Sequence, residues 1–331
     1  MVNVGIIGLG GMGRVHYNCY LNNPQAKIVA LCDIDQRKLD GDWSAISLNI
    51  DTSKTPLVDL GDAKKYLSYA DLLADPNIDM VDICLPTPLH APVAIAAMKA
   101  GKHVLCEKPM ARQSSQAEEM IATAKETGKQ LMIAQCLRYW GQYVSAGEII
   151  KSGRYGKVLY ASFSRAGGTP MTAWNNWYLD GQMSGGVILD MHIHDVDAAL
   201  WWFGKPDSIT ATGYSRGGHP ALVDATWTYN GGPLVYLHSH WDANQPSFAY
   251  TFHVIMEHAS LSIDSSKDEG LHLYTAEGGH SQVELTPESA YQNEVNDFVD
   301  AVATGRKLTR VLPESSALSI EVALEEIRQI G

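Results

Sequence analysis

The feature that most constrains this chain is a glycine-rich turn between an apolar strand and a helix. Residues 2–7 form an apolar run, residues 8–13 read GLGGMG, and the pattern predicts a helix over 12–21. A second strand is predicted over 27–32, immediately before Asp33. A strand, turn, helix and second strand with an acid about 20 residues after the turn are typical of a parallel α/β sheet that binds a dinucleotide.

Each residue type in this turn has a physical task. Gly8 permits the tight turn, Gly10 lets the backbone approach a pyrophosphate, and Gly13 lets the helix pack closely on the strand. The helix N-terminus offers N–H groups to phosphates. Asp33 accepts hydrogen bonds from a ribose and repels a 2′-phosphate, so we expect NAD rather than NADP, with the basic pair at 37–38 opposing that preference.

Length and composition narrow the class of protein. A chain of 331 residues suits two domains, and its net charge of −12 argues against a nucleic-acid partner. No stretch approaches the ~20 apolar residues of a membrane span, and a strand beginning at residue 2 leaves no room for a signal peptide. Five cysteines without a C-x-x-C pair indicate a reduced, cytoplasmic protein without a metal site.

The first part of the chain alternates strands and helices. We predict strands over 80–85, 103–106 and 131–134, and helices over 91–100 and 114–126. This rhythm predicts an N-terminal Rossmann domain with a doubly wound parallel sheet over 1–134. The region 40–56 does not read as the long crossover helix expected there, and we expect a shortened helix and an ordered loop.

The second part changes pattern. Strand-like segments follow one another over 157–165, 208–214, 222–229, 234–241, 250–257 and 261–264, and helices are predicted over 289–304 and 314–330. The fold class is therefore α/β, with a C-terminal α+β domain over 135–331 built on a mainly antiparallel open sheet.

Lys108 is the first candidate catalytic residue. It follows the predicted strand 103–106 within Glu107-Lys108-Pro109. Open α/β sheets bind ligands at the carboxyl ends of their strands. When a hydride leaves or joins the carbon of an alcohol or carbonyl group, a cation that donates hydrogen bonds suits the oxygen on that carbon. Glu107 is expected to hold the turn rather than to take part in the chemistry.

A predicted helix over 186–203 carries the second candidate. Asp190 and His194 are four residues apart and share a face. A carboxylate beside an imidazole fixes its tautomer and makes a general acid–base pair. The alternative is an amphipathic helix with ordinary polar surface residues, and His192 and Asp195 offer other pairings. A metal site would need a third ligand that the segment does not identify.

Aromatic and polar residues in the second half suggest the kind of substrate. Trp174 and Trp177 lie in the polar segment 173–180, and a tryptophan beside Asn and Asp suits a sugar ring. Arg165 offers donors to hydroxyl groups. Packing within the core or between subunits is the alternative role of these rings.

Several motifs occur in a fixed order. They are the turn at 8–13 with Asp33, PTPLH at 86–90, AGKHVLCEKP at 100–109, Arg138-Tyr139, and SGG at 184–186 followed by Asp190 and His194. Together they resemble the Gfo/Idh/MocA oxidoreductase family, over nearly the whole chain.

The resemblance implies a site for NAD and a substrate pocket between the domains. It implies cofactor contacts at Gly8, Leu9, Gly10, Gly11, Met12, Gly13, Asp33, Ile34, Pro86, Thr87, His90, Glu107, Lys108 and Arg138. It implies catalysis and substrate contacts by Lys108, Asp190 and His194. The aromatic and polar residues described above add Arg165, Trp174 and Trp177 as expected substrate contacts. It also implies a homodimer or homotetramer formed through the C-terminal sheet.

The implied activity is that of an NAD-dependent dehydrogenase acting on a CH–OH group. The substrate is expected to be a sugar, glycoside or cyclitol oxidised at a secondary ring hydroxyl. Two alternatives remain. One is a redox-neutral NAD-dependent glycosidase, and the other is a non-catalytic dinucleotide-binding sensor, against which an intact Lys108, Asp190 and His194 argue.

Overall fold

The computed structural model describes residues 1–46, 56–170, 174–241, 248–285 and 289–330. The chain divides into two compact units. The first unit is Met1–Cys136 with Ser289–Ala317, and the second is Leu137–Glu288 with Leu318–Gly331.

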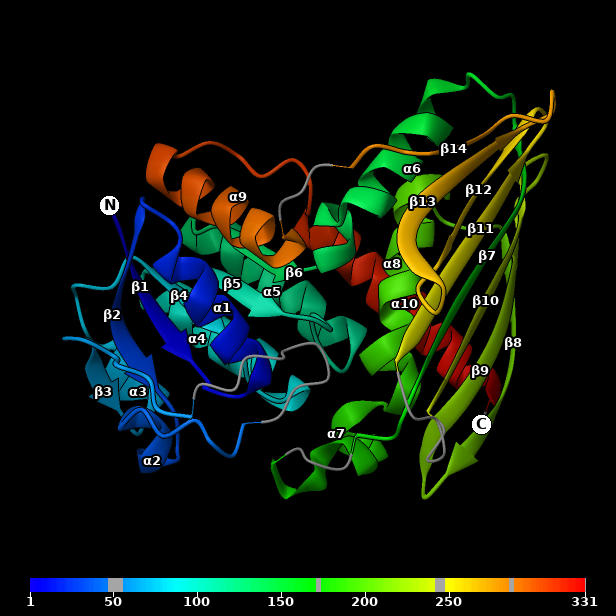
Figure 1. Cartoon of the computed structure of the whole chain (residues 1–331). Coiled ribbons are helices and arrows are strands. Elements are labelled where there is room, and N and C mark those ends of the chain that lie inside the picture. The colour runs from blue at the N-terminus through cyan, green and yellow to red at the C-terminus, as the bar shows by residue number, and fades with distance from the viewer. Residues whose placement is uncertain (47–55, 171–173, 242–247, 286–288, 331) are drawn as a thin grey trace. The chain divides into compact units, whose positions relative to one another are not determined.

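Over its described residues, the first unit is built on a six-stranded parallel sheet, ordered β3-β2-β1-β4-β5-β6 (Figure 1). The strands are β1 (Val2–Ile7), β2 (Ala26–Cys32), β3 (Lys64–Tyr66), β4 (Met80–Ile83), β5 (His103–Glu107) and β6 (Leu131–Ala134). β4 and β6 are buried throughout, as strands covered on both faces should be. The predicted doubly wound parallel sheet is confirmed.

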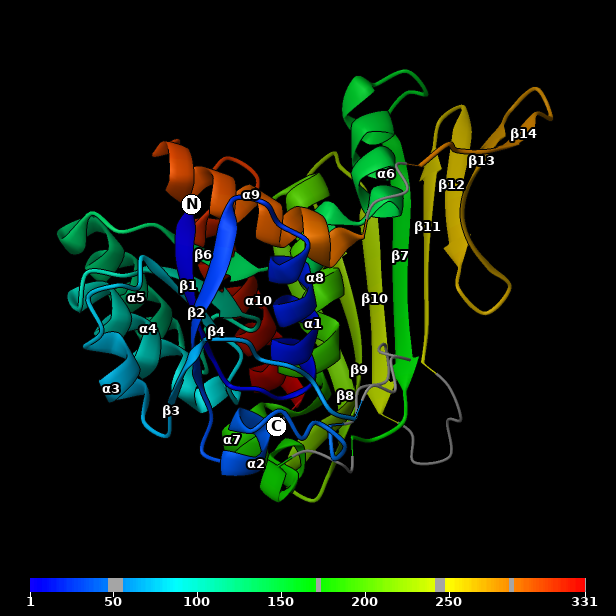
Figure 2. The same cartoon turned by 60° about the vertical axis from the view of Figure 1, so that its left-hand side comes forward.

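Helices cover both faces of this sheet. They are α1 (Gly11–Leu21), α2 (Gln36–Leu39), α3 (Tyr69–Leu73), α4 (His90–Lys99), α5 (Ser114–Thr127) and α9 (Ala290–Thr304), with the 3₁₀ turn η1 (Thr87–Leu89) before α4. α1 and α9 lie together on one face, and α3, α4 and α5 lie on the other (Figure 2). The order in which strands are added to the sheet reverses between β1 and β4, and the carboxyl ends of these adjacent parallel strands form the usual ligand-binding edge.

α9 joins the first unit although the sequence analysis assigned its residues to the second domain. Val295, Phe298 and Val299 are fully buried, and α9 packs against α1 and β1. The Gln292 side chain also donates to the carbonyl oxygen of Cys19 at 3.0 Å. An apolar helix face packs against any complementary surface, so the pattern over 289–304 could not identify which unit it covers.

The region after β2 contains a short helix, α2, which ends at Leu39, just before the region 40–56 for which a shortened helix and an ordered loop were expected. α2 is a single turn whose N-cap, Asp35, accepts a hydrogen bond from the backbone N–H of Arg37. Trp43 is buried against the ring edge of Tyr17, with centroids 5.0 Å apart. Residues 47–55 lie outside the described residues.

The second unit contains, in its described part, an eight-stranded sheet ordered β14-β13-β12-β11-β7-β10-β9-β8. The strands are β7 (Val158–Gly167), β8 (Ser208–Arg216), β9 (His219–Thr228), β10 (Leu234–Trp241), β11 (Ala249–Met256), β12 (Ala259–Asp264), β13 (Asp268–Thr275) and β14 (His280–Gln282). β7 and β10 run parallel and the other neighbours are antiparallel. The predicted, mainly antiparallel sheet is confirmed.

Helices of the second unit pack on one face of its sheet (Figure 1). They are α6 (Gly141–Ser152), α7 (Gly181–Ser184), α8 (Ile193–Phe203) and, from Leu318 onward, α10 (Pro313–Ile330), with the short turns η2 (Cys136–Tyr139), η3 (Trp174–Leu179) and η4 (Ile188–His192). Among the described residues, no helix combines the length and apolar character needed to cross a membrane.

Candidate active site

The glycine turn after β1 has the geometry that a dinucleotide requires. Gly8 has φ of 97°, and a Cβ there would lie 2.4 Å from the carbonyl oxygen of Cys84. A Cβ on Gly13 would lie 2.0 Å from the carbonyl oxygen of Gly8. A Cβ on Gly10 would meet no described atom within 4 Å. The turn is therefore closed where it packs on the protein and open at Gly10, where a pyrophosphate would approach the start of α1.

Asp33 ties this turn to the end of β2. Its carboxylate accepts the backbone N–H of Leu9 at 2.8 Å and of Asp35 at 2.9 Å. The ammonium of Lys38 lies 3.1 Å from the same Oδ2 that Leu9 contacts. Asp33 is thus placed where an adenosine ribose would bind, with a cation beside it, while the next side chain, Ile34, is exposed.

The other predicted cofactor residues of this edge fall on two adjacent loops. Gly11 and Met12 are half-exposed at the start of α1. Pro86 is the N-cap of η1 and Thr87 is its first residue, in the loop that follows β4. Because β1 and β4 are parallel neighbours in the sheet, these loops lie at the same edge, where the order of the strands reverses.

Lys108 is the partly exposed residue of a buried segment. In residues 104–111, its side chain alone is half-exposed, and the others are buried. Its backbone N–H donates to Oε2 of Glu107 at 3.0 Å, and the peptide bond to Pro109 is cis. Glu107 holds this turn, and the cation stands at the carboxyl end of β5, as the sequence analysis expected.

His90, an expected cofactor residue, makes two contacts to the backbone. The ring is buried, with Nδ1 2.7 Å from the carbonyl oxygen of Pro109 and Nε2 2.7 Å from that of Leu85. Both ring nitrogens therefore face backbone oxygens of the protein. We assign His90 to joining the loop after β4 to the loop after β5.

In the second unit, Asp190 and His194 are the half-exposed residues of a buried helical segment. Every other residue from 184 to 200 is buried. The expected continuous α-helix is instead a π-turn, η4, followed by α8. π-turns occur frequently at functional sites. Gly186, with φ of 65°, precedes this turn and approaches Pro220 so closely that a Cβ would lie 2.3 Å from its carbonyl oxygen.

His192 is buried on the opposite side of the same segment. Its Nδ1 lies 2.9 Å from the hydroxyl of Ser239, and its Nε2 lies 3.1 Å from a carboxylate oxygen of Glu326. Glu326 also accepts the indole N–H of Trp227 at 2.8 Å. His192 therefore fastens the π-turn to the sheet and to α10, which leaves His194 as the solvent-facing imidazole.

Two arginines expected at ligands form buried ion pairs instead. Arg138 donates to both carboxylate oxygens of Asp197, each at 2.8 Å. Arg165 donates to Asp195 at 3.1 and 2.9 Å and to the hydroxyl of Tyr143 at 3.1 Å. Both guanidinium groups are almost fully buried. These ion pairs hold both guanidinium groups within the second unit.

The aromatic segment before α7 begins at Trp174, whose side chain lies outside the described residues. Asn175 and Asn176 have φ of 49° and 50°, a conformation that asparagine tolerates better than most residues. Trp177 is half-exposed and stacks on Tyr178, with ring centroids 4.0 Å apart. One face of the indole is thus supported by an aromatic ring.

A buried polar cluster that was not predicted from the sequence lies beside Lys108. It comprises His16 and Tyr20 on α1, Asp82 on β4, Cys84 after that strand, and Glu107 at the end of β5. The available signal was the acid at 82, which interrupts an otherwise apolar strand. Because a buried acid rarely lacks a partner, Asp82 indicated that a cation or a hydrogen-bond donor lies beside it.

Both parts of the chain match known families. Residues 2–135 match an oxidoreductase family described as having an NAD-binding Rossmann fold, GFO_IDH_MocA, and residues 143–262 match the GFO/IDH/MocA C-terminal domain. A 1,5-anhydro-D-fructose reductase of Ensifer adhaerens is 31% identical over 252 residues, which are 73% of this chain and 74% of that protein.

Other relatives are more distant or match over a shorter length. An inositol 2-dehydrogenase of Rubrobacter xylanophilus is 29% identical over 61% of this chain, and the match spans only 52% of that protein. A levoglucosan dehydrogenase, solved with NADH and levoglucosan, has the same fold with a TM-score of 0.84 at 20% identity, over 99% of this chain and 96% of that one. An aldose-aldose oxidoreductase from Caulobacter crescentus gives 0.83 at 21% identity, over 99% and 97%.

Proposed function

Because the chain belongs to the Gfo/Idh/MocA oxidoreductase family, we propose that it is an NAD-dependent dehydrogenase of a sugar, glycoside or cyclitol. The reaction is the oxidation of a secondary ring hydroxyl to a ketone, or its reverse. The observation that carries the proposal is the pattern of exposure. Lys108, Asp190 and His194 are the polar side chains that emerge from otherwise buried segments.

These three residues have complementary roles in the proposal. NAD, when bound, would supply the hydride acceptor, and Gly10 and the start of α1 would hold its pyrophosphate. His194 takes the proton of the substrate hydroxyl. Lys108 donates a hydrogen bond to the same oxygen and stabilises its developing negative charge. Asp190 orients the imidazole of His194 or binds a neighbouring hydroxyl.

The names of relatives support the substrate class. The related proteins include an inositol dehydrogenase and an anhydrofructose reductase, whose substrates are a cyclitol and a sugar derivative. Trp177, supported by Tyr178, offers an aromatic face that suits the apolar face of a sugar ring.

A panel of cyclitols, sugars and glycosides tests the proposal. Each compound is incubated with the protein and NAD, and NADH absorbance is followed. We expect NADH to form with at least one cyclic polyol. Release of aglycone from a glycoside without net NADH would identify the redox-neutral glycosidase instead. Turnover of acyclic aldehydes alone would contradict the carbohydrate assignment.

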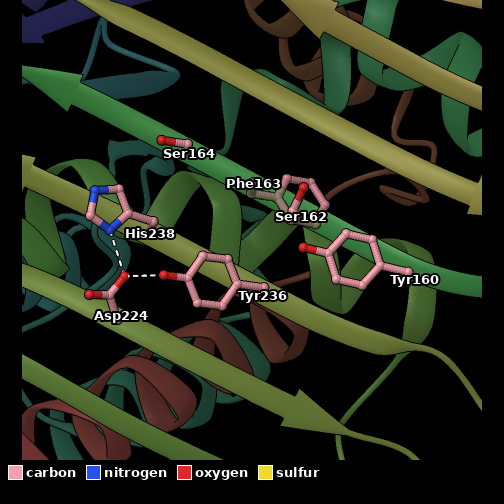
Figure 3. Close-up of a pocket in the computed structure, with 7 residues that line it drawn as sticks. All are labelled: Tyr160, Ser162, Phe163, Ser164, Asp224, Tyr236 and His238. Atoms are coloured by element: carbon pink, nitrogen blue, oxygen red, sulfur yellow. Dashed lines mark hydrogen bonds and ion pairs between the residues drawn. The ribbon is translucent and has the colours of Figure 1, made fainter.

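We also propose that a second copy of the chain packs on the sheet face opposite the helices of the second unit. Half-exposed Tyr160, Ser162, Tyr236 and His238 surround a shallow hollow of about 490 Å³ on this face (Figure 3). The hydroxyl of Tyr236 and Nδ1 of His238 both meet Asp224. Light scattering should give a dimer or tetramer, and Tyr160→Glu should yield monomers. A monomeric wild-type protein would refute this arrangement.

A further inference from the structure

The buried polar cluster of the first unit has no part in the function proposed above. His16 and Asp82 have no side-chain exposure, and Glu107 has 8%. Placing charged groups in a protein interior carries a desolvation cost of several kcal/mol per ion unless they are well paired. The arrangement of this cluster therefore needs an explanation.

The contacts form a chain that ends at Lys108. Oδ2 of Asp82 accepts the hydroxyl of Tyr20 at 2.8 Å and lies 2.8 Å from Nδ1 of His16. On the other side of the imidazole, Nε2 lies 3.3 Å from Oε1 of Glu107. The second oxygen of Glu107 accepts the backbone N–H of Lys108 at 3.0 Å.

The charge of His16 fits a bridging role. Burial lowers its pKa, but the charge of Asp82 opposes this and the pKa lies well above the ordinary value. A protonated imidazole places its positive charge between the two carboxylates. It hydrogen-bonds to Asp82 through Nδ1, whereas Nε2 meets Glu107 as an ion pair without hydrogen-bond geometry.

A metal ion is a poorer explanation of the same residues. Ligand atoms of His16, Asp82 and Cys84 all lie within 4.8 Å of one another. A metal would require a neutral imidazole and a thiolate, whereas burial raises the pKa of the Cys84 thiol. The hydroxyl of Tyr20 also donates to Oδ2 of Asp82, the oxygen that faces His16.

We propose that His16 is a positioning residue for Lys108, because it fixes the Glu107 carboxylate and thereby the backbone of Lys108. α1 carries His16 and begins at the glycine turn, so one helix sets both the pyrophosphate site and the lysine. His90 holds the other side of the same turn through the carbonyl oxygen of Pro109. The catalytic part of this inference rests on the proposed function, while the connection through Glu107 lies within the first unit.

His16→Gln tests the connection, because glutamine can still donate to Asp82 but cannot bridge to Glu107. The first readout is the rate at which an amine-acylating reagent labels Lys108 in the cofactor-free protein, followed by peptide mass spectrometry. The second is steady-state kinetics with a substrate from the panel. We expect the labelling rate to change by about threefold or more and kcat to fall about tenfold or more, as for a displaced catalytic group. KM and the Kd for NAD should change less than about threefold.

Glu107→Gln should reproduce these effects. The double variant should lose no more than either single variant, because both substitutions break one connection. If His16→Gln fails to fold, the labelling rate and kcat of Glu107→Gln decide the question, and unchanged values would refute the inference.

Tyr20→Phe is the matched control. It removes a hydrogen bond to the same oxygen of Asp82 but leaves the contact between His16 and Glu107 intact. We expect a lower Tm with unchanged labelling and kcat. If His16→Gln behaves like this control, His16 only stabilises the fold and the inference fails. A stoichiometric metal ion in the purified protein would also overturn it. Absence of turnover by the wild-type protein counts against the proposed function, and the labelling comparison still decides the role of His16.

Discussion

Lys108 in the first unit and the pair Asp190 and His194 in the second are exposed in the same way but are held by different means. Each emerges from a segment whose other residues are buried. The turn that carries Lys108 is held by side chains from other elements, since Glu107 meets His16 and Pro109 meets His90.

The segment of the second unit depends more on its backbone. Gly185 and Gly186 have φ of 77° and 65°, and a π-turn follows. Its buried anchor, His192, lies within the turn itself. Activity that depends on Lys108 should therefore fall when a single polar side chain that holds its turn is substituted, even at a distance. Activity that depends on Asp190 and His194 should fall mainly when the helical register of their segment is shifted.

Lys108→Met should have the largest effect. Methionine keeps the length of the side chain but removes its charge and its donors. We expect kcat to fall by at least ~10²-fold, as when an oxyanion-stabilising donor is removed. Affinity for NAD, measured by calorimetry, should change far less. Lys99→Met, at an exposed site in the last turn of α4, is the control. Normal turnover by Lys108→Met would mean that Lys108 has no catalytic role and that its turn does not hold a catalytic residue.

His194→Ala should have the next largest effect and tests the second unit. Loss of a general base typically lowers the rate by ~10²-fold or more. His192→Ala should retain more activity but unfold at a lower temperature, because it leaves the buried carboxylate of Glu326 without its imidazole. Steady-state rates and thermal denaturation of both variants decide between them. The reverse ranking of rates would mean that the exposed side of the π-turn has been assigned to the wrong histidine.

The sequence was most informative where function depends on local geometry. The turn at 8–13 requires glycine at fixed positions, and the lysine follows a strand directly, so both could be found from adjacent residues. Arg138 and Arg165 could not be interpreted in this way. Their partners Asp197 and Asp195 lie 59 and 30 residues away, and no local pattern distinguishes a buried ion pair from a ligand contact.

The π-turn and the last strands illustrate two other limits. Over five residues, a π-turn and an α-helix have nearly the same pattern of buried positions, so η4 was predicted as ordinary helix. β13 and β14 were missed because their sequences, DEGLHLYT and HSQ, are too polar or too short to show a clear alternation. β13 pairs with β12, and β14 then adds to its free edge, because an edge strand offers unpaired hydrogen-bonding groups.

A smaller effect is expected for the preference for NAD over NADP, which depends on Asp33 and Lys38 in the first unit. Asp33 would repel a 2′-phosphate, so NAD should bind about tenfold more tightly than NADP. Lys38 lies 3.1 Å from the Asp33 carboxylate and weakens this repulsion. Lys38→Met should therefore widen the preference. Calorimetric titration of the wild-type protein and the variant with both cofactors measures the preference, and equal or tighter binding of NADP by the wild-type protein would contradict the role of Asp33.

The smallest effect is expected at Trp177 in the second unit, which directly follows two asparagines with positive φ. Its indole stacks on Tyr178 and keeps a partly exposed surface. An aromatic face that contacts a sugar ring stabilises the bound substrate and the transition state alike, so its loss should raise KM more than it lowers kcat. We expect KM to rise about fivefold in Trp177→Ala, in line with the ~1 kcal/mol of one aromatic contact. Trp177→Phe keeps the stacking and should recover most of this loss. A fall in kcat with unchanged KM would instead mean that this loop, like the turn at Lys108, positions a reacting group.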